Sequence, residues 1–153
     1  MQGLALRDLA PDDTGQLYAL LQTNQSHLTA YDDYRDQVAA SLEGLAAELA
    51  ERASGKRRFG IFLDGTLIGR ADLTPVDQPR LGLGYWLAKN ETGKGYARAA
   101  LTTLLRFAAS ELGATEIYAG VTHGNERSAA LLRRLDFVPI TSFESYTRFR
   151  LLL

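Results

Sequence analysis

One stretch constrains the fold of this chain most strongly. In residues Leu81–Ala109, a buried strand, a glycine turn and a long helix follow one another, LGLGYWLAKNETGKGYARAALTTLLRFAA. Gly93 and Gly95 lack a Cβ, so the backbone can turn sharply there and a ligand can approach its N–H groups closely. Those groups lie at a helix N-terminus, where four donors lack intrahelical partners and the helix dipole is positive. The stretch therefore predicts a strand–turn–helix unit that binds a phosphate-bearing ligand.

Two common phosphate-binding loops do not fit this turn. A P-loop has Ser or Thr after Gly-Lys to bind magnesium, whereas Lys94 is followed by Gly95. A dinucleotide-binding fingerprint has a third glycine at the place where Arg98 stands. It also has an acidic ribose ligand at the end of the next strand, and here that strand ends in Val121-Thr122. A nucleotide-binding α/β domain is therefore disfavoured.

The composition narrows the class of protein further. The 153 residues are enough for one domain with a proper core, and 46% hydrophobic with 23% charged residues is normal for a globular protein. Without cysteine there is no disulfide or thiolate zinc site, and two histidines disfavour a metal enzyme. A net charge of −1 disfavours a nucleic-acid partner. No apolar run approaches the roughly 20 residues of a membrane span and no signal peptide is visible. We therefore expect no membrane partner, a cytoplasmic location, and a monomer or homodimer.

Hydrophobic periodicity and turn signals predict the order of the elements. Antiparallel strands come first, around the strong hairpin signal Asp64-Gly65, and strand–helix alternation follows, which together predict an α+β fold. The predicted strands are Gly3–Arg7, Arg58–Leu63, Thr66–Leu73, Arg80–Ala88, Glu116–Val121, a strand that Asp136-Phe137 leads into, and Tyr146–Leu153. The predicted helices run from Asp12-Asp13 to about Asn24, over Asp36–Ala53, from the glycine turn onward, and over Ser128–Leu135, with a polar, aromatic loop at Gln25–Tyr34.

Three segments resemble the GNAT N-acetyltransferase superfamily. Thr92–Ala97 resembles its R/Q-x-x-G-x-G/A acetyl-CoA loop, with Thr92 where Gln or Arg is usual. Gly84–Leu87 resembles the GYWL strand of the RimL-like branch, which acetylates N-terminal amines of ribosomal proteins and related amines. Asn125–Phe137 resembles the family's N-x-x-S-xx-L-x-x-x-GF segment, with Asp136 where glycine is usual. The segments occur in the family's order and spacing, so together they are more specific than any one of them.

The resemblance extends over most of the chain, because Leu4–Arg7, Asp12-Asp13 and Leu17–Leu21 look like the family's opening strand and helix. It implies one GNAT domain over residues 1–153, with a mixed, mostly antiparallel central sheet, helices on both faces, and a splay between the two central strands. It also implies acetyl-CoA as cofactor and direct transfer of the acetyl group to a primary amine of a protein N-terminus, polyamine, amino acid or antibiotic. The alternative left open is a non-catalytic acyl-CoA-binding module or sensor.

The resemblance also assigns binding residues. Backbone N–H groups of residues 94–98 would hold the pyrophosphate, and the pantetheine arm would pair with the backbone near Trp86–Ala88, where a strand N–H would stabilise the oxyanion. The predicted cofactor-binding residues are Trp86, Leu87, Ala88, Thr92, Gly93, Lys94, Gly95, Tyr96, Ala97, Arg98, Asn125 and Ser128. The predicted acceptor-binding residues are Asn24, His27, Leu28 and Tyr31, and no metal ligand is predicted.

Acetyl transfer requires proton handling, because the amine must lose a proton before attack and the CoA thiolate must gain one. Ser128 matches the position of the serine proposed as the acid in the RimL-like branch, and Tyr146 is the alternative acid. Glu144 and His123 are the candidate bases, and water could take the proton if neither side chain does. Ser128 also has a purely structural interpretation, because Asn125 is a favoured N-cap that would bind its N–H.

The charge of the acceptor segment suggests the charge of the acceptor. The resemblance places residues 24–34 over the acetyl group, and Asp32, Asp33 and Asp36 outnumber the single Arg35 beside them. Negative charge at a pocket entrance raises the local concentration of a cationic amine, and salt screens the effect. The sequence therefore predicts a positively charged acceptor, unless these aspartates only solvate a loop.

Overall fold

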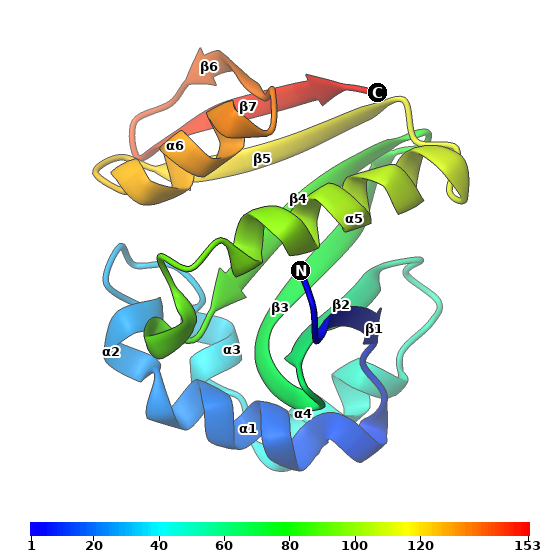
Figure 1. The fold of residues 1–153 in the computed structure, drawn as a ribbon, viewed down its shortest axis with the longest axis vertical. Coiled ribbons are helices and arrows are strands. Elements are labelled where there is room, and N and C mark those ends of the chain that lie inside the picture. The colour runs from blue at the N-terminus through cyan, green and yellow to red at the C-terminus, as the bar shows by residue number, and fades with distance from the viewer.

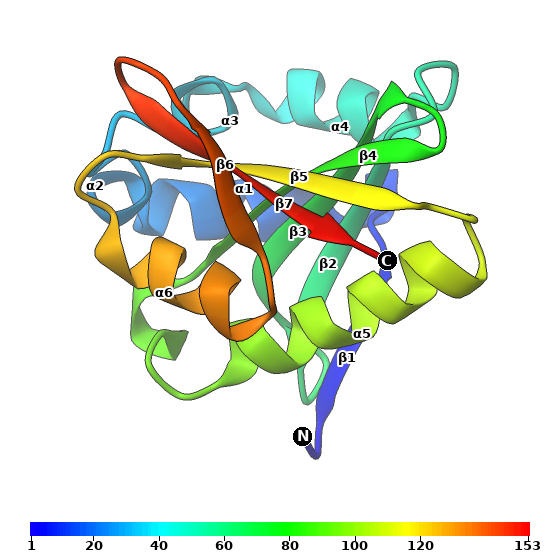
Figure 2. The ribbon, with the colours of Figure 1, turned by 90° about the horizontal axis from the view of Figure 1, so that it is seen from above.

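The chain folds around one seven-stranded sheet with the strand order β1-β2-β3-β4-β5-β7-β6 in a computed structural model that describes residues 1–153. All neighbouring strands are antiparallel except β4 and β5. The sheet lies between helices α1–α4 on one face and α5 and α6 on the other (Figure 2). This arrangement confirms the predicted α+β class, with its mostly antiparallel sheet and helices on both faces. None of the helices combines the length and the hydrophobicity that a membrane span requires.

The elements follow the predicted order closely. The strands are β1 (Leu4–Asp8), β2 (Arg57–Leu63), β3 (Thr66–Asp77), β4 (Arg80–Leu87), β5 (Glu116–Thr122), β6 (Val138–Ser142) and β7 (Tyr146–Leu152). The helices are α1 (Thr14–Thr23), α2 (Gln25–Leu28), α3 (Arg35–Ala39), α4 (Leu42–Ala50), α5 (Tyr96–Ser110) and α6 (Glu126–Arg134), with 3₁₀ turns η1 (Pro11–Asp13) and η2 (Lys89–Glu91).

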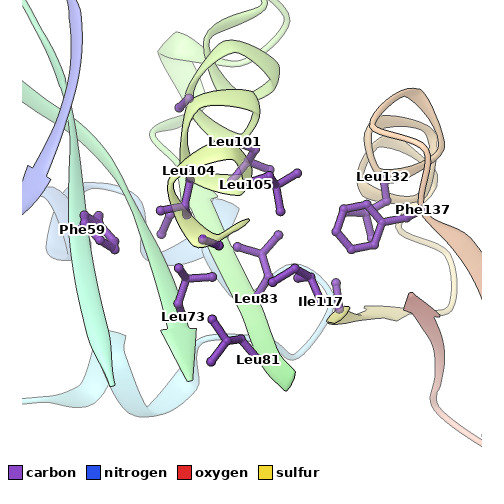
Figure 3. Packing of buried hydrophobic residues seen from close by; sticks show 14 of the residues in the cluster. Phe59, Leu73, Leu81, Leu83, Leu101, Leu104, Leu105, Ile117, Leu132 and Phe137 are labelled. Atoms are coloured by element: carbon purple, nitrogen blue, oxygen red, sulfur yellow. The ribbon is translucent and has the colours of Figure 1, made fainter. Parts of the chain in front are cut away.

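Two hydrophobic clusters fix the sheet between its helices. The larger one fills the space between the sheet and α5, where Leu101 and Leu104 face Leu83 and Ile117 (Figure 3). The smaller one joins α1, α2 and α4 to the other face and includes Trp86. Strand β4 therefore points its leucines toward α5 and Trp86 toward α1, as strand alternation requires.

The two central strands part along their length. β4 and β5 pair only where Arg80–Gly82 meets Glu116–Tyr118, and beyond this point no sheet hydrogen bond joins them (Figure 1). The predicted splay is therefore confirmed, with a slot between Leu83–Leu87 and Ala119–Thr122. We call the paired end the vertex of the slot and the other end its mouth.

Three predicted elements differ from the structure by more than two residues. The helix predicted over Asp36–Ala53 is broken into α3 and α4, because Ser41 is extended and accepts a hydrogen bond from the Gly44 N–H at 3.0 Å. Ser is a favoured N-cap, and this local bond starts a new helix inside a continuous apolar pattern. The segment Gln25–Tyr34 is not all loop, since its first four residues form α2.

Strand β3 continues beyond its predicted end at Leu73, through Pro75, to Asp77. The edge of β3 that faces β2 is unpaired beyond Leu73, which is the last residue that β2 contacts. Pro75 lacks an N–H but costs no sheet hydrogen bond on a free edge, so the strand tolerates it.

An ion-pair network beneath α4 predicts a pH dependence of stability. Glu48 accepts hydrogen bonds from Arg70 at 2.8 Å and Arg58 at 3.3 Å, and Arg70 is almost fully buried. Burial alone would raise the pKa of Glu48, but the hydrogen bonds and positive charges of Arg70, Lys56 and Arg58 outweigh it and lower this pKa. A carboxyl group whose pKa is lowered by folding stabilises the protein above its unfolded pKa, about 4.3, and loses that effect as the pH falls.

We therefore expect Glu48→Gln to lower the free energy of unfolding at pH 7 by about 2 kcal/mol, because a charged hydrogen-bond partner is lost. The variant should also lose less stability than the wild type between pH 5 and more acidic values, which urea titrations at a series of pH values would measure. Glu43→Gln on the exposed face of the same helix is the matched control. Parallel pH curves for wild type and Glu48→Gln would contradict the assignment.

Candidate active site

A cluster of backbone N–H groups without hydrogen-bond partners lies at the mouth of the slot. No protein group accepts a hydrogen bond from the N–H groups of residues 93–98, which lead into the fifteen-residue helix α5. Gly93 and Gly95 have φ values of +76° and +86°, in the left-handed region that side chains rarely adopt. Such a turn at a helix N-terminus is an anion-binding site, and it suits a pyrophosphate.

The side chains around this turn divide between binding and local structure. The Thr92 hydroxyl donates to the Lys89 carbonyl at 2.7 Å, so it holds the preceding 3₁₀ turn together. Lys94 lies 3.6 Å from Glu91 on the surface, and Arg98 is exposed on the first turn of α5. Lys94 and Arg98 can therefore add positive charge beside the backbone donors, whereas the hydroxyl proton of Thr92 is already used.

The β4 edge of the slot presents alternate backbone groups. The Tyr85 carbonyl accepts a hydrogen bond from the Tyr34 hydroxyl, and the Leu87 carbonyl lies 3.1 Å from Nε2 of His27. The Ala88 N–H instead donates to Ile68 of β3 at 2.8 Å. Ala88 therefore turns its N–H away from the slot, which corrects part of the predicted pairing region. The backbone that faces the slot is that of Tyr85 and Leu87, and since their carbonyls already have partners, their N–H groups are the ones left for a pantetheine arm or oxyanion.

Ser128 and Tyr85 form a bridge across the slot on the α5 and α6 face. Their hydroxyl oxygens lie 2.6 Å apart, and both residues are half-buried. Ser128 stands at the start of α6, where Asn125 is the N-cap and accepts a hydrogen bond from the Ser128 N–H at 3.3 Å. The predicted cap is present, and it places the Ser128 hydroxyl at the slot rather than in solvent.

A second bridge crosses the mouth on the opposite face. It is made by residues 29–34, which we call the α2–α3 loop. Asp33 accepts a hydrogen bond from the Thr122 hydroxyl of β5 at 2.8 Å, while Tyr34 bonds to β4 as described. The ring of Tyr31 lies beside Gly124, just after β5. The α2–α3 loop thus contacts both strands near the ends that lie farthest from their paired residues.

A pocket of about 320 Å³ opens at the vertex, on the face that carries α1–α4. Gly82, Gly84 and Gly120 form its floor, because glycines on this face leave the sheet without side chains. Its walls include Asp72, Lys56, Tyr118, Tyr146 and Arg148. A ligand in this pocket would reach the slot from the side opposite Ser128.

Charges in the pocket are unevenly balanced. Asp72 is paired with Arg70 at 3.0 Å and with Lys56 at 3.5 Å, so its negative charge is compensated. Arg148 has no carboxylate within ion-pair distance, and its guanidinium stacks over the ring of Tyr118 at 5.5 Å. Arg148 is therefore the uncompensated cation of the pocket.

The remaining catalytic candidates lie near the β5–α6 and β6–β7 connections. Tyr146 lines the pocket, stacked on Phe143 with 4.8 Å between ring centroids. The exposed His123 ring lies 3.3 Å from the Thr147 hydroxyl, and Glu144 is exposed with no hydrogen-bond partner. The structure therefore brings Ser128 to the slot and Tyr146 to the pocket, but does not bring His123 or Glu144 to Ser128.

Two of the predicted acceptor-binding residues hold the loops in place. Asn24 is buried, and its side chain accepts from the Lys89 N–H and donates to the Leu20 carbonyl, both at 2.9 Å. Leu28 is buried in the smaller hydrophobic cluster. Trp86, a predicted cofactor residue, is buried there too and donates to Gln37 at 2.9 Å. Asn24, Leu28 and Trp86 can therefore contribute to binding only by positioning other groups. His27 and Tyr31 lie at the mouth of the slot, where a ligand could contact them.

Comparison with known proteins agrees with this geometry. Residues 4–138 match the family described as an acetyltransferase (GNAT) domain. The chain belongs to the GNAT acetyltransferase family. It is 29% identical to the Bacillus subtilis protein YdaF, which is named as a putative ribosomal N-acetyltransferase, over 88% of this chain and 78% of that protein. The predicted family membership is therefore confirmed.

Solved structures share the fold of this GNAT domain. RimL, a ribosomal L7/L12 N-acetyltransferase solved with CoA, is 17% identical with a TM-score of 0.88, covering all of this chain and 96% of RimL. Spermidine N-acetyltransferase from Vibrio cholerae, solved with CoA and spermine, is 20% identical with a TM-score of 0.83, covering 99% and 96% of the two chains. At this level of identity the likeness concerns the fold.

Several residues of this candidate site were not singled out from the sequence. The pocket residues Asp72 and Arg148 lie on strands that only tertiary folding brings together. The spacing of Gly82 and Gly84 could have indicated the pocket, because two glycines at alternate positions of a strand leave one face of it without side chains. Tyr85 lies within the predicted strand Arg80–Ala88, and none of its neighbours in the sequence indicates a contact with Ser128.

Proposed function

We propose that this protein is an acetyl-CoA-dependent N-acetyltransferase that moves the acetyl group to a primary amine by direct attack on the thioester. One observation carries the proposal: a slot between parted strands joins the unpartnered N–H groups of residues 93–98 at its mouth to a pocket on the other face at its vertex. A cofactor bound from one face and an amine entering from the other can meet only in this slot. We further propose the cytoplasm as its location, and a monomer or homodimer as its form.

Acetyl-CoA, when bound, supplies an activated acetyl thioester. The N–H groups of residues 93–98 would hold its pyrophosphate, with Lys94 and Arg98 beside them. The slot-facing backbone of Tyr85 and Leu87 would align the pantetheine arm like an added strand. The Leu87 N–H is our candidate for the oxyanion donor, a contact whose loss typically costs about 3–4 kcal/mol of transition-state stabilisation.

Ser128 is our candidate for the acid. As the amine forms its new C–N bond and the C–S bond breaks, the Ser128 hydroxyl gives its proton to the departing sulfur. The proton of the amine goes to water, or to His123 or Glu144 if either reaches the acceptor. Ser128 then regains a proton from solvent. Tyr146 lies on the pocket face, so as the alternative acid it would have to act from there.

Turnover with a panel of amines tests the proposal. Release of free thiol from acetyl-CoA would be followed with a polyamine, a peptide with a free N-terminus, single amino acids and an aminoglycoside, each compared with a reaction lacking amine. We expect amine-dependent release with at least one class. Tight CoA binding in calorimetry without any amine-dependent release would favour the alternative, a non-catalytic acyl-CoA-binding module or sensor.

The charge of the α2–α3 loop supports a cationic acceptor. Asp32 is paired with Arg35, whereas Asp33 at the mouth and Asp36 in the first turn of α3 have no ion-pair partner. Arg148 stands at the other end of the slot, so a cationic acceptor would extend toward the loop and away from the vertex. We propose that charge attraction at the mouth contributes to acceptor binding.

We therefore expect kcat/KM for a spermidine-like amine to fall as ionic strength rises, and to fall further in an Asp33→Asn/Asp36→Asn double variant. The amide introduced by Asp33→Asn keeps an oxygen that can accept from Thr122, so the bridge at the mouth should survive. Glu43→Gln/Glu111→Gln, the same change of charge at exposed positions on α4 and after α5, is the control. A preference for an acidic N-terminal peptide over the polyamine at low salt would overturn the expectation.

A further inference from the structure

The Tyr85–Ser128 pair carries an inference about the acid of the reaction. It rests on the proposed function, because it concerns how Ser128 would act in that site. Tyr85 belongs to β4 and Ser128 to α6, 43 residues apart, and their hydroxyl oxygens lie 2.6 Å from each other. We propose that Tyr85 is a positioning residue that donates a hydrogen bond to Oγ of Ser128 and thereby aims the Ser128 proton at the thiol of CoA.

The direction of this hydrogen bond follows from the chemistry of the two groups. A phenol is a far stronger acid than an aliphatic alcohol, so Tyr85 is the better donor and Ser128 the better acceptor. No other protein group is hydrogen-bonded to either hydroxyl. If Tyr85 donates to Oγ, the Ser128 proton has no protein acceptor and remains free for a ligand in the slot.

The surroundings hold the phenol in this role. Burial raises the pKa of Tyr85, and the hydrogen bond from Ser128 to a phenolate would only partly offset this, so the group stays protonated. The ring packs against the larger hydrophobic cluster, which fixes its direction. The Asn125 cap fixes the other partner by holding the Ser128 backbone at 3.3 Å. Two rigid elements therefore present the pair to the slot.

The hydrogen bond should also make Ser128 a better proton donor. When Ser128 gives its proton to the sulfur, negative charge develops on Oγ, and a hydrogen bond donated by Tyr85 stabilises that charge. The S–H bond forms as the O–H bond of Ser128 breaks, and the Tyr85 proton remains shared with Oγ until solvent restores Ser128. The Tyr85 hydroxyl itself needs no contact with the substrate.

Tyr85→Phe removes the hydroxyl and keeps the ring, so we expect the protein to remain folded with little change in its thermal midpoint. We expect kcat to fall about tenfold, as for the loss of one hydrogen bond that forms with developing charge, with little change in KM for acetyl-CoA. Tyr18→Phe on α1, away from the slot, is the matched control. A fall in kcat after Tyr18→Phe as well would overturn the assignment to the pair.

A binding measurement tests the pair without turnover. Calorimetry would compare CoA with desulfo-CoA, which lacks the sulfur, over a range of pH. In the wild type we expect the preference for CoA to grow as the pH rises and the thiolate forms, because the Ser128 proton is aimed at it. Tyr85→Phe and Ser128→Ala should each reduce this preference, and the double variant should reduce it no further than Ser128→Ala alone.

Failure of this inference can be distinguished from failure of the proposed function. If Tyr85→Phe leaves the preference for CoA unchanged, or weakens both ligands equally, Tyr85 is a packing residue and the inference is wrong. If the wild type binds CoA with this pH dependence but acetylates no amine, the proposed function fails and the pairing of Tyr85 with Ser128 still holds.

Discussion

Replacing Gly95 with valine is expected to weaken CoA binding by about 100-fold, the equivalent of one or two charged hydrogen bonds. Gly95 has φ +86°, and a β-branched residue cannot hold that conformation without strain. The space beside Gly95 is open, because an added Cβ would only approach Met1 at 3.6 Å. The substitution should therefore re-aim the N–H groups of residues 93–98 rather than disrupt the fold, and calorimetry with CoA would measure the loss.

A matched control separates backbone strain from ligand binding. Gly113 also has a left-handed φ, +64°, with open space around it, and lies beyond the other end of α5. Gly113→Val should lower the thermal midpoint to a similar degree and leave CoA affinity unchanged. Unchanged affinity in Gly95→Val would remove the glycine turn from the binding site.

The second large effect is expected from Ser128→Ala. Removal of a general acid typically lowers the rate by about 10²–10⁴-fold, so kcat should fall by that factor. The affinity for acetyl-CoA should change little, because the thioester carries no charge on sulfur before the reaction. Steady-state kinetics with the best amine of the panel and calorimetry with acetyl-CoA would measure the two quantities.

Ser110→Ala at the exposed end of α5 is the control for this variant, since its hydroxyl only bonds to the Arg106 carbonyl. A fall of only a few-fold in Ser128→Ala would mean that Ser128 is an N-terminal residue of α6 and no acid. In that case Tyr146, on the pocket side, would be the next candidate, and Tyr146→Phe should then show the large loss of kcat.

Features that depend on a few neighbouring residues could be predicted from the sequence. The glycine turn, the Asp64-Gly65 hairpin and the Asn125 cap are each set by a few neighbouring residues, and the structure has all three. Asp136 stands where the family usually has glycine. Its φ of +71° is a conformation that glycine adopts most easily and that aspartate tolerates, so the structure keeps the same turn.

Features that depend on distant residues were not predictable in this way. The break between α3 and α4 depends on one hydrogen bond, from the Gly44 N–H to the Ser41 side chain. The helical spacing of apolar residues continues across the break and does not reveal it. The slot was expected only through the family resemblance, since no local signal ends the pairing of β4 with β5. The Tyr85–Ser128 pair, the Asp33–Thr122 bond and the position of Arg148 join residues from separate elements, so they follow from the packing of the whole sheet.

The parted strands also affect how the protein unfolds. β4 and β5 share three residue pairs, fewer than any other neighbouring strands in the sheet. Separating β4 from β5 breaks the fewest backbone hydrogen bonds. Partial unfolding of the sheet should therefore begin between them and separate β1–β4 from β5–β7. A ligand lying along the slot would supply hydrogen bonds where the two strands do not pair with each other. Ligand binding should therefore join the two parts of the sheet into one cooperative unit.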